Sequence, residues 1–153
     1  MIIASIGGFA SMLGLNIGYN VESQFALAQD VDPNNATALT DKGLILADLG
    51  KNEEAVTYFD KALALEPDDT RALYNKGLAL YDLGKYDEAI TYFDKALAIN
   101  ASDSDALYNK GLALAELGKY DEAITYFDKV LAIDPSDKQA LDQKGIAQAK
   151  LGK

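Results

Sequence analysis

The sequence of 153 residues contains no cysteine and no histidine. Without cysteine the chain forms no disulfide and offers no thiolate nucleophile. Without cysteine and histidine, sites for zinc, copper or haem lose their usual ligands, and a Ser-His-Asp or Cys-His relay cannot be built. We therefore expect a protein that is not an enzyme and that holds no metal or other cofactor.

Positively charged residues are also scarce. The 14 lysines and arginines are outnumbered by 24 aspartates and glutamates, so the net charge is −10. Nucleic acids and anionic lipid surfaces are bound by Lys and Arg side chains that neutralise phosphates, so we expect neither as a partner. The charge favours solubility and partners that are neutral or basic proteins.

Residues 1–21 carry no charge at all. Their length is barely enough for a membrane anchor, and they lack the positive start of a secretory signal. A pilin-type assembly helix would have an acidic residue soon after Gly8-Phe9, and none is present. Because a segment with no polar face is normally buried on all sides, we expect it to pack against protein, within the chain or between subunits, and expect no stable membrane insertion.

A repeat of 34 residues organises the rest of the sequence. Residues 66–99 and 100–133 are identical at 26 of 34 positions, and residues 32–65 are a third, more divergent copy. Residues 134–153 begin a fourth copy and stop halfway through it. Such a period is typical of proteins that stack pairs of helices.

Each copy predicts two helices separated by a glycine turn. Leu73, Gly77 and Leu80 recur at steps of three and four residues, which places them on one helix face. Gly84 follows them and tolerates the left-handed conformation that ends a helix. The predicted first helices begin after good N-cap residues, which are Asn35, Asp69, Asp103 and Asp137.

The repeat resembles that of the tetratricopeptide-repeat family. Family repeats carry a small residue on the first helix, two small residues around an aromatic on the second, and a proline at the junction. The matching residues are Gly43, Gly77, Gly111 and Gly145; Ala55, Ala89 and Ala123; Phe59, Phe93 and Phe127; Ala62, Ala96 and Val130; and Pro33, Pro67 and Pro135. Leucines replace the family's first-helix Trp and Tyr and keep those positions apolar. The resemblance implies an all-α, right-handed solenoid of helix pairs whose first helices line a concave groove.

The resemblance also implies that a ligand would lie in this groove. Some family members clamp the C-terminal carboxylate of a chaperone there with Lys and Arg, but only Arg71 stands at such a place here. The groove residues carried over by position are Thr40, Leu44, Arg71, Tyr74, Asn75, Leu78, Tyr81, Tyr108, Asn109 and Leu112. Tyrosine, leucine and asparagine suit an extended peptide that is uncharged or basic, with the amides bonding its backbone. The alternative is that these residues are alike through recent duplication and bind nothing.

The two ends of the sequence look like complementary halves of a repeat. Residues 138–151 predict a first helix alone, and a shift of two periods places Phe25 on Phe93, so that residues 18–31 resemble a second helix. The residues expected to associate are Val21, Phe25, Ala28 and Val31 at one end and Leu141, Gly145, Ile146 and Leu151 at the other. Pairing between copies predicts a structural protein that assembles head to tail into a filament or ring.

One alternative to self-assembly remains open. Residues 3–15 also resemble a degenerate first helix, and the last helix resembles the polar cap that closes many such stacks. In that case the chain is a monomeric adaptor that captures a partner peptide.

Asn35 and Asn100 begin candidate N-glycosylation triplets, which slightly favour an extracellular or cell-surface location over the cytoplasm.

Overall fold

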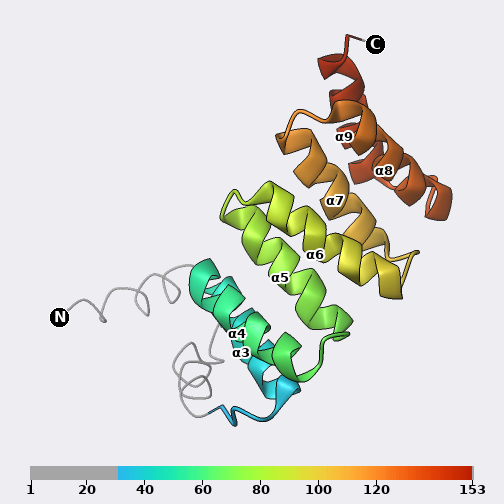
Figure 1. Cartoon of the computed structure of the whole chain (residues 1–153). Helices are drawn as coiled ribbons and strands as arrows, with labels where there is room; N and C mark the ends of the chain where they lie inside the picture. Colours follow the sequence, from blue (N-terminus) through green and yellow to red (C-terminus); the bar gives the residue numbers. More distant parts are fainter. Residues whose placement is uncertain (1–30, 153) are drawn as a thin grey trace, which may run out of the picture. The chain divides into compact units, whose positions relative to one another are not determined.

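The computed structural model describes residues 31–152, and these form seven α-helices. The chain divides into two units, Met1–Val31 and Asp32–Lys153, and the fold described below is that of the second unit. Its helices are α3 (Ala36–Asp48), α4 (Asn52–Leu65), α5 (Thr70–Asp82), α6 (Tyr86–Ile99), α7 (Ser104–Glu116), α8 (Tyr120–Ile133) and α9 (Lys138–Lys150). Each helix packs against the next in antiparallel fashion (Figure 1). The predicted all-α solenoid of helix pairs is confirmed.

Each first helix begins at a capping side chain and ends at a glycine. Oδ1 of Asn35 accepts a hydrogen bond from the backbone N of Ala38 at 3.0 Å. The equivalent caps are Asp69, Asp103 and Asp137. Beyond the other end, Gly84 adopts a φ of 73°, which is the left-handed conformation that closes a helix. The predicted caps and turns are confirmed.

The core of each complete repeat is a phenylalanine packed against a glycine. The rings are those of Phe59, Phe93 and Phe127, all 0% exposed. A Cβ atom added to Gly77 would lie 2.6 Å from Cε1 of Phe93. Real Cβ atoms do not approach that closely, so only glycine lets the two helices of the repeat come together.

Buried lysines connect neighbouring repeats. Nζ of Lys76 on α5 donates hydrogen bonds to Asp60 on α4 and to the hydroxyl of Tyr92 on α6, the latter at 2.6 Å. Burial alone lowers the pKa of Lys76, but its bonds to Asp60 and Tyr92 outweigh this and raise the pKa above its usual value. The same arrangement recurs at Lys110, Asp94 and Tyr126. The lysine therefore stays charged and ties three helices together.

Candidate functional site

The first helices of successive repeats lie side by side. Helix α3 contacts α5, α5 contacts α7, and α7 contacts α9. Half-buried side chains on these helices therefore share one surface, which we call the first-helix face. Its members are Leu44, Tyr74, Asn75, Leu78, Tyr81, Tyr108, Asn109 and Leu112.

A tyrosine and an asparagine join α5 to α7 across this face. Nδ2 of Asn109 donates to the hydroxyl of Tyr74 at 3.0 Å and to the backbone O of Asp105 at 2.9 Å. Nδ2 of Asn75 donates to the backbone O of Arg71 at 2.7 Å. A side-chain amide has two N–H groups and one carbonyl oxygen, so Asn109 uses both donors within the chain. Its Oδ1 is the atom that can accept a hydrogen bond from a bound peptide.

Carboxylates surround the tyrosines of the first-helix face. Burial, together with Asp105 and Asp103, raises the pKa of Tyr74 to about 12. Burial and neighbouring carboxylates also raise the pKa of Tyr81, near Glu116, and of Tyr108, near Asp137 and Asp142. A negative potential disfavours a tyrosinate, and the same potential attracts a cationic ligand and repels an anionic one.

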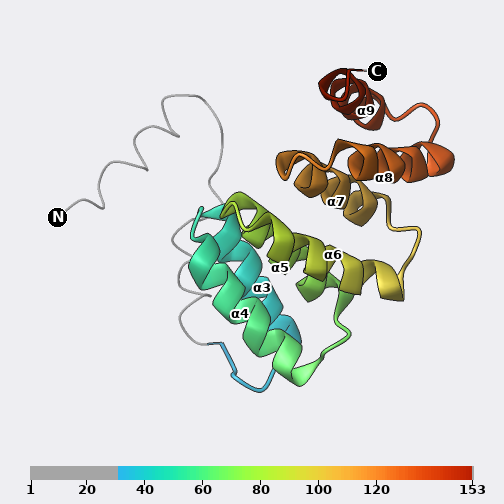
Figure 2. The ribbon, with the colours of Figure 1, turned by 45° about the horizontal axis from the view of Figure 1, so that its top comes forward.

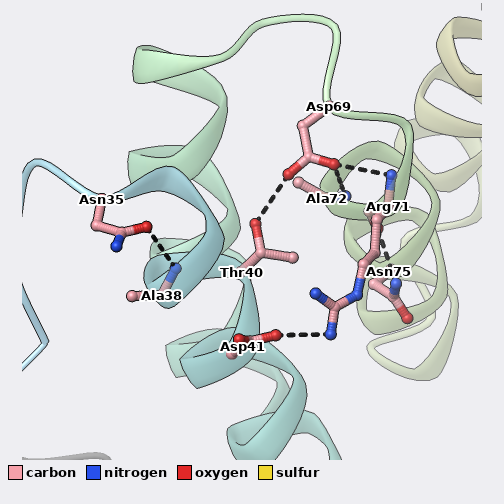
Figure 3. A network of polar contacts seen from close by, with 8 residues as sticks. All are labelled: Asn35, Ala38, Thr40, Asp41, Asp69, Arg71, Ala72 and Asn75. Carbon is pink, nitrogen blue, oxygen red and sulfur yellow. Dashed lines mark hydrogen bonds and ion pairs between the residues drawn. The ribbon is translucent and has the colours of Figure 1, made fainter.

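A polar network at α3 and α5 includes three of the predicted groove residues, Thr40, Arg71 and Asn75 (Figure 3). Nη2 of Arg71 lies 2.6 Å from Oδ1 of Asp41, so the arginine is paired with a carboxylate. Thr40 is 0% exposed, and its hydroxyl donates to Oδ2 of Asp69 at 3.0 Å. The prediction that Thr40 faces a ligand is wrong, because its side chain lies inside the protein and ties α3 to the cap of α5.

Helix α9 differs from the other first helices in its exposure. Leu141 is 48% exposed and Ile146 is 52% exposed, whereas Leu107, the counterpart of Leu141 on α7, is 4% exposed. Leu151 and Val31 are half-buried. The other residues predicted to associate with α9, which are Val21, Phe25 and Ala28, lie outside the described residues.

Asn35 and Asn100 lie in exposed turns before first helices. Oδ1 of Asn35 caps α3, and Oδ1 of Asn100 accepts from the backbone N of Ser102 at 3.3 Å. A glycan would attach to Nδ2 of each residue, an atom that neither bond uses, so both stay candidate sites. Between residues 31 and 152, no helix is long and apolar enough to cross a bilayer, and no acidic side chains gather as a metal site would require.

Comparison with known proteins identifies the family. The family model described as a tetratricopeptide repeat (TPR) matches residues 24–70, 40–104 and 74–138. The chain belongs to the tetratricopeptide-repeat family. The resemblance seen in the repeats is thereby confirmed. TPR proteins are in general non-enzymatic modules for protein–protein interaction, and the TPR fold of this chain implies a role in protein–protein interaction.

Solved TPR structures superimpose on most of the chain. The first TPR of Spaghetti (RPAP3), bound to the HSP90 peptide SRMEEVD, is 27% identical, with a TM-score of 0.75, covering 80% of this chain and 98% of that one. The second TPR domain of human RPAP3, in complex with the HSP70 peptide SGPTIEEVD, is 28% identical, with a TM-score of 0.71, covering 74% and 94%. MamA from Desulfovibrio magneticus RS-1 is 28% identical, with a TM-score of 0.81, covering 93% and 81%. No curated protein matches the sequence.

Proposed function

We propose that this TPR chain binds an extended segment of a partner protein along its first-helix face, and that the segment carries basic side chains. The tyrosine row supports the proposal, because burial raises the pKa of Tyr74, Tyr81 and Tyr108 and neighbouring carboxylates raise it further, so negative charge lies near each of these rings. A peptide with alternating apolar and basic side chains would place its apolar groups on the tyrosines and its cations near the carboxylates.

The charges on the first-helix face favour a ligand unlike that of RPAP3. The HSP90 peptide in that structure, SRMEEVD, contains two glutamates and one aspartate. An acidic peptide needs accessible cations, but Arg71 is paired with Asp41. Lys76 and Lys110 are buried and also paired with aspartates. An acidic peptide would therefore meet like charges here, and like charges at an interface reduce affinity.

Fluorescence anisotropy with three matched peptides tests the proposal. The peptides have the same length and leucine spacing, and the residues between the leucines are lysine, serine or glutamate. We expect the lysine peptide to bind most tightly and the glutamate peptide most weakly. The preference should shrink as salt is added, because salt screens exposed charges. Equal binding of all three peptides would contradict the proposal.

Charge-reversal variants locate the binding surface. Asp82→Lys with Glu116→Lys places two positive charges beside Tyr81 and should weaken binding of the lysine peptide about tenfold, or about 1.4 kcal/mol. The matched control is Glu88→Lys with Glu122→Lys, which changes the net charge equally but acts on α6 and α8. The proposal fails if the control pair weakens binding as much as the first pair.

Head-to-tail self-assembly is a second candidate function. The exposed apolar side chains of Leu141 and Ile146 on α9 favour it, since large apolar side chains exposed on a surface often belong to an interaction site. It is compatible with peptide binding, because Leu141 occupies the repeat position of Leu107, which is not a member of the first-helix face. The mass of the protein in solution as a function of concentration tests it directly.

A further inference from the structure

Helix α9 keeps the glycine that receives a phenylalanine in every complete repeat. In those repeats, a Cβ added to the first-helix glycine would lie 2.5–2.7 Å from a ring atom. The glycines are Gly43, Gly77 and Gly111, and the rings belong to Phe59, Phe93 and Phe127. Gly145 holds the same register, yet no atom of the described part of the chain lies within 4 Å of a Cβ placed there. Because glycine is a poor helix former, Gly145 destabilises α9, and no described aromatic ring packs against it.

Leu141, one turn before Gly145, is also far more exposed than its counterparts in the complete repeats. A leucine lies four residues before each of these first-helix glycines. Leu39 is 2% exposed, Leu73 is 3% exposed and Leu107 is 4% exposed, whereas Leu141 is 48% exposed. Leu107 packs with Val130 of the second helix α8 and with Ala140 of α9. The position that holds Leu114 in α7, where the side chain is 2% exposed, is occupied in α9 by the polar residue Gln148. One polar side chain in an otherwise apolar contact favours a docking that is reversible.

The turn that leads into α3 is built like the turns that connect repeats. The backbone N of Asn35 donates to the backbone O of Asp32 at 3.1 Å, and the equivalent bonds at the caps of α5, α7 and α9 are each 3.2 Å. The N of Asn34 also donates to Oδ1 of Asp32 at 2.9 Å, just as the N of Ser136 donates to Oδ1 of Asp134 at 2.9 Å. The other turns of this kind follow the second helices α4, α6 and α8. The turn before α3 is therefore of the kind that follows a second helix elsewhere in the described stack.

The sequence of residues 18–31 supplies the side chains that a second helix needs. Moved by one repeat, Phe25 falls on Phe59 and Ala28 falls on Ala62, two residues that are 0% exposed. The match to the family model begins at residue 24 and so includes these positions. The segment thus carries a ring and a small residue in the register that Gly145 requires.

We infer that α9 of one copy of this chain receives residues 18–31 of a second copy, with Phe25 seated against Gly145, so that two half repeats complete one repeat. This rests on the proposed self-assembly and specifies which two surfaces of the copies meet. Helices α3 and α9 lie at opposite ends of the described stack (Figure 2). The contact is therefore heterologous, and each copy offers one half to each neighbour.

The link between the segment and α3 is short compared with the distance to α9. Only residues 32–35 separate it from α3, and a link of five residue steps spans at most about 18 Å. Helix α9 is three first-helix contacts away from α3, and packed helices are about 8–10 Å apart at each contact. The short link therefore favours a neighbouring copy as the source of the segment that binds α9.

Sedimentation velocity of the whole chain over a range of concentrations tests the inference. Gly145→Ala is the informative variant, because its added methyl group meets no described atom in the isolated copy but would collide with a docked Phe25. We expect the average mass of the wild type to rise with concentration. Gly145→Ala and Phe25→Ala should each raise the dissociation constant at least tenfold, and Gln148→Leu should lower it about tenfold. Gln139→Ala, on another side of α9, is the matched control and should assemble like the wild type.

Mixing two variants separates this contact from any other mode of association. The Gly145→Ala copy keeps an intact residue 18–31 segment, and the Phe25→Ala copy keeps an intact α9. Each should be monomeric alone, and an equal mixture should form dimers and nothing larger. A mixture that stays monomeric overturns the inference. A wild type that is monomeric throughout overturns both it and the proposed self-assembly, whereas assembly unaffected by Gly145→Ala overturns the contact and leaves self-assembly standing.

Discussion

The substitution Gly77→Ala tests the packing that sets the spacing of helices within a repeat. The new Cβ would lie 2.6 Å from Cε1 and 2.8 Å from Cδ1 of Phe93. Phe93 is 0% exposed and packs with Leu80, Ala89 and Tyr74, whose ring centroid lies 6.0 Å from its own. The ring cannot move away without displacing these neighbours, so the helices must separate.

The expected change in stability is a balance of two effects. Alanine is better than glycine inside a helix by about 1 kcal/mol. Overpacking a core costs about 1–3 kcal/mol, and a contact this short belongs at the upper end. Gly77→Ala should therefore lower the free energy of unfolding by about 2 kcal/mol, while Gly145→Ala, which has only the helix gain, should raise it by about 1 kcal/mol.

Urea unfolding followed by far-ultraviolet circular dichroism measures both variants, at a concentration where the chain is monomeric. The difference of about 3 kcal/mol between them isolates the Gly77–Phe93 contact, since the helix gain is common to both. Gly77→Ala combined with Phe93→Leu should lose less stability than the two single changes added together, because the residues are in contact. The reasoning is refuted if Gly77→Ala stabilises the protein as Gly145→Ala does.

Three further predictions address capping, ionisation and helix ends. Asp69→Ala and Asp103→Ala should each lower the free energy of unfolding by about 1 kcal/mol through the lost helix cap. Asp69→Ala should lower it by about 1–2 kcal/mol more, because it leaves the buried hydroxyl of Thr40 without its acceptor. Equal decreases in urea unfolding would mean that the bond to Thr40 adds nothing to stability. The pKa of Tyr74 is raised from 10.0 to about 12, so its contribution to the free energy of unfolding is complete below pH 10 and is lost as the pH rises towards 12. In the Tyr74→Phe variant, the free energy of unfolding should fall by about 1 kcal/mol less over this pH range, allowing for partial exposure. Identical profiles of thermal stability against pH for the two proteins would argue against this. Gly84→Ala should lower the melting temperature by an amount equivalent to about 1–2 kcal/mol, because alanine is strained at a φ of 73°; an unchanged melting temperature would mean that the turn tolerates a side chain.

Most of the fold was predictable because its signals are local and recur. The caps at Asp69 and Asp103, the turn at Gly84 and the pairing of Gly77 with Phe93 all follow from spacing within one repeat. Repetition of each signal at 34-residue intervals reinforced it. These signals are the ones that start, end and pair helices.

The candidate site was less predictable. Thr40 occupies the same repeat position as Tyr74, and position alone placed both in the groove; the structure buries Thr40 on Asp69 instead. The lysine network was missed as well, although its signal was present in the sequence. Asp60, Lys76 and Tyr92 are spaced by 16 residues, and the pattern returns one repeat later.

The sequence by itself determined the helices, their ends, their pairing and the family, because these depend on interactions within one repeat. Only the tertiary structure decided which polar side chains remain available to a partner. Arg71 is neutralised by Asp41, Lys76 is buried between Asp60 and Tyr92, and both outcomes depend on contacts between adjacent helices. Burial and pairing of this kind arise only when repeats stack, and no pattern within a single helix specifies them.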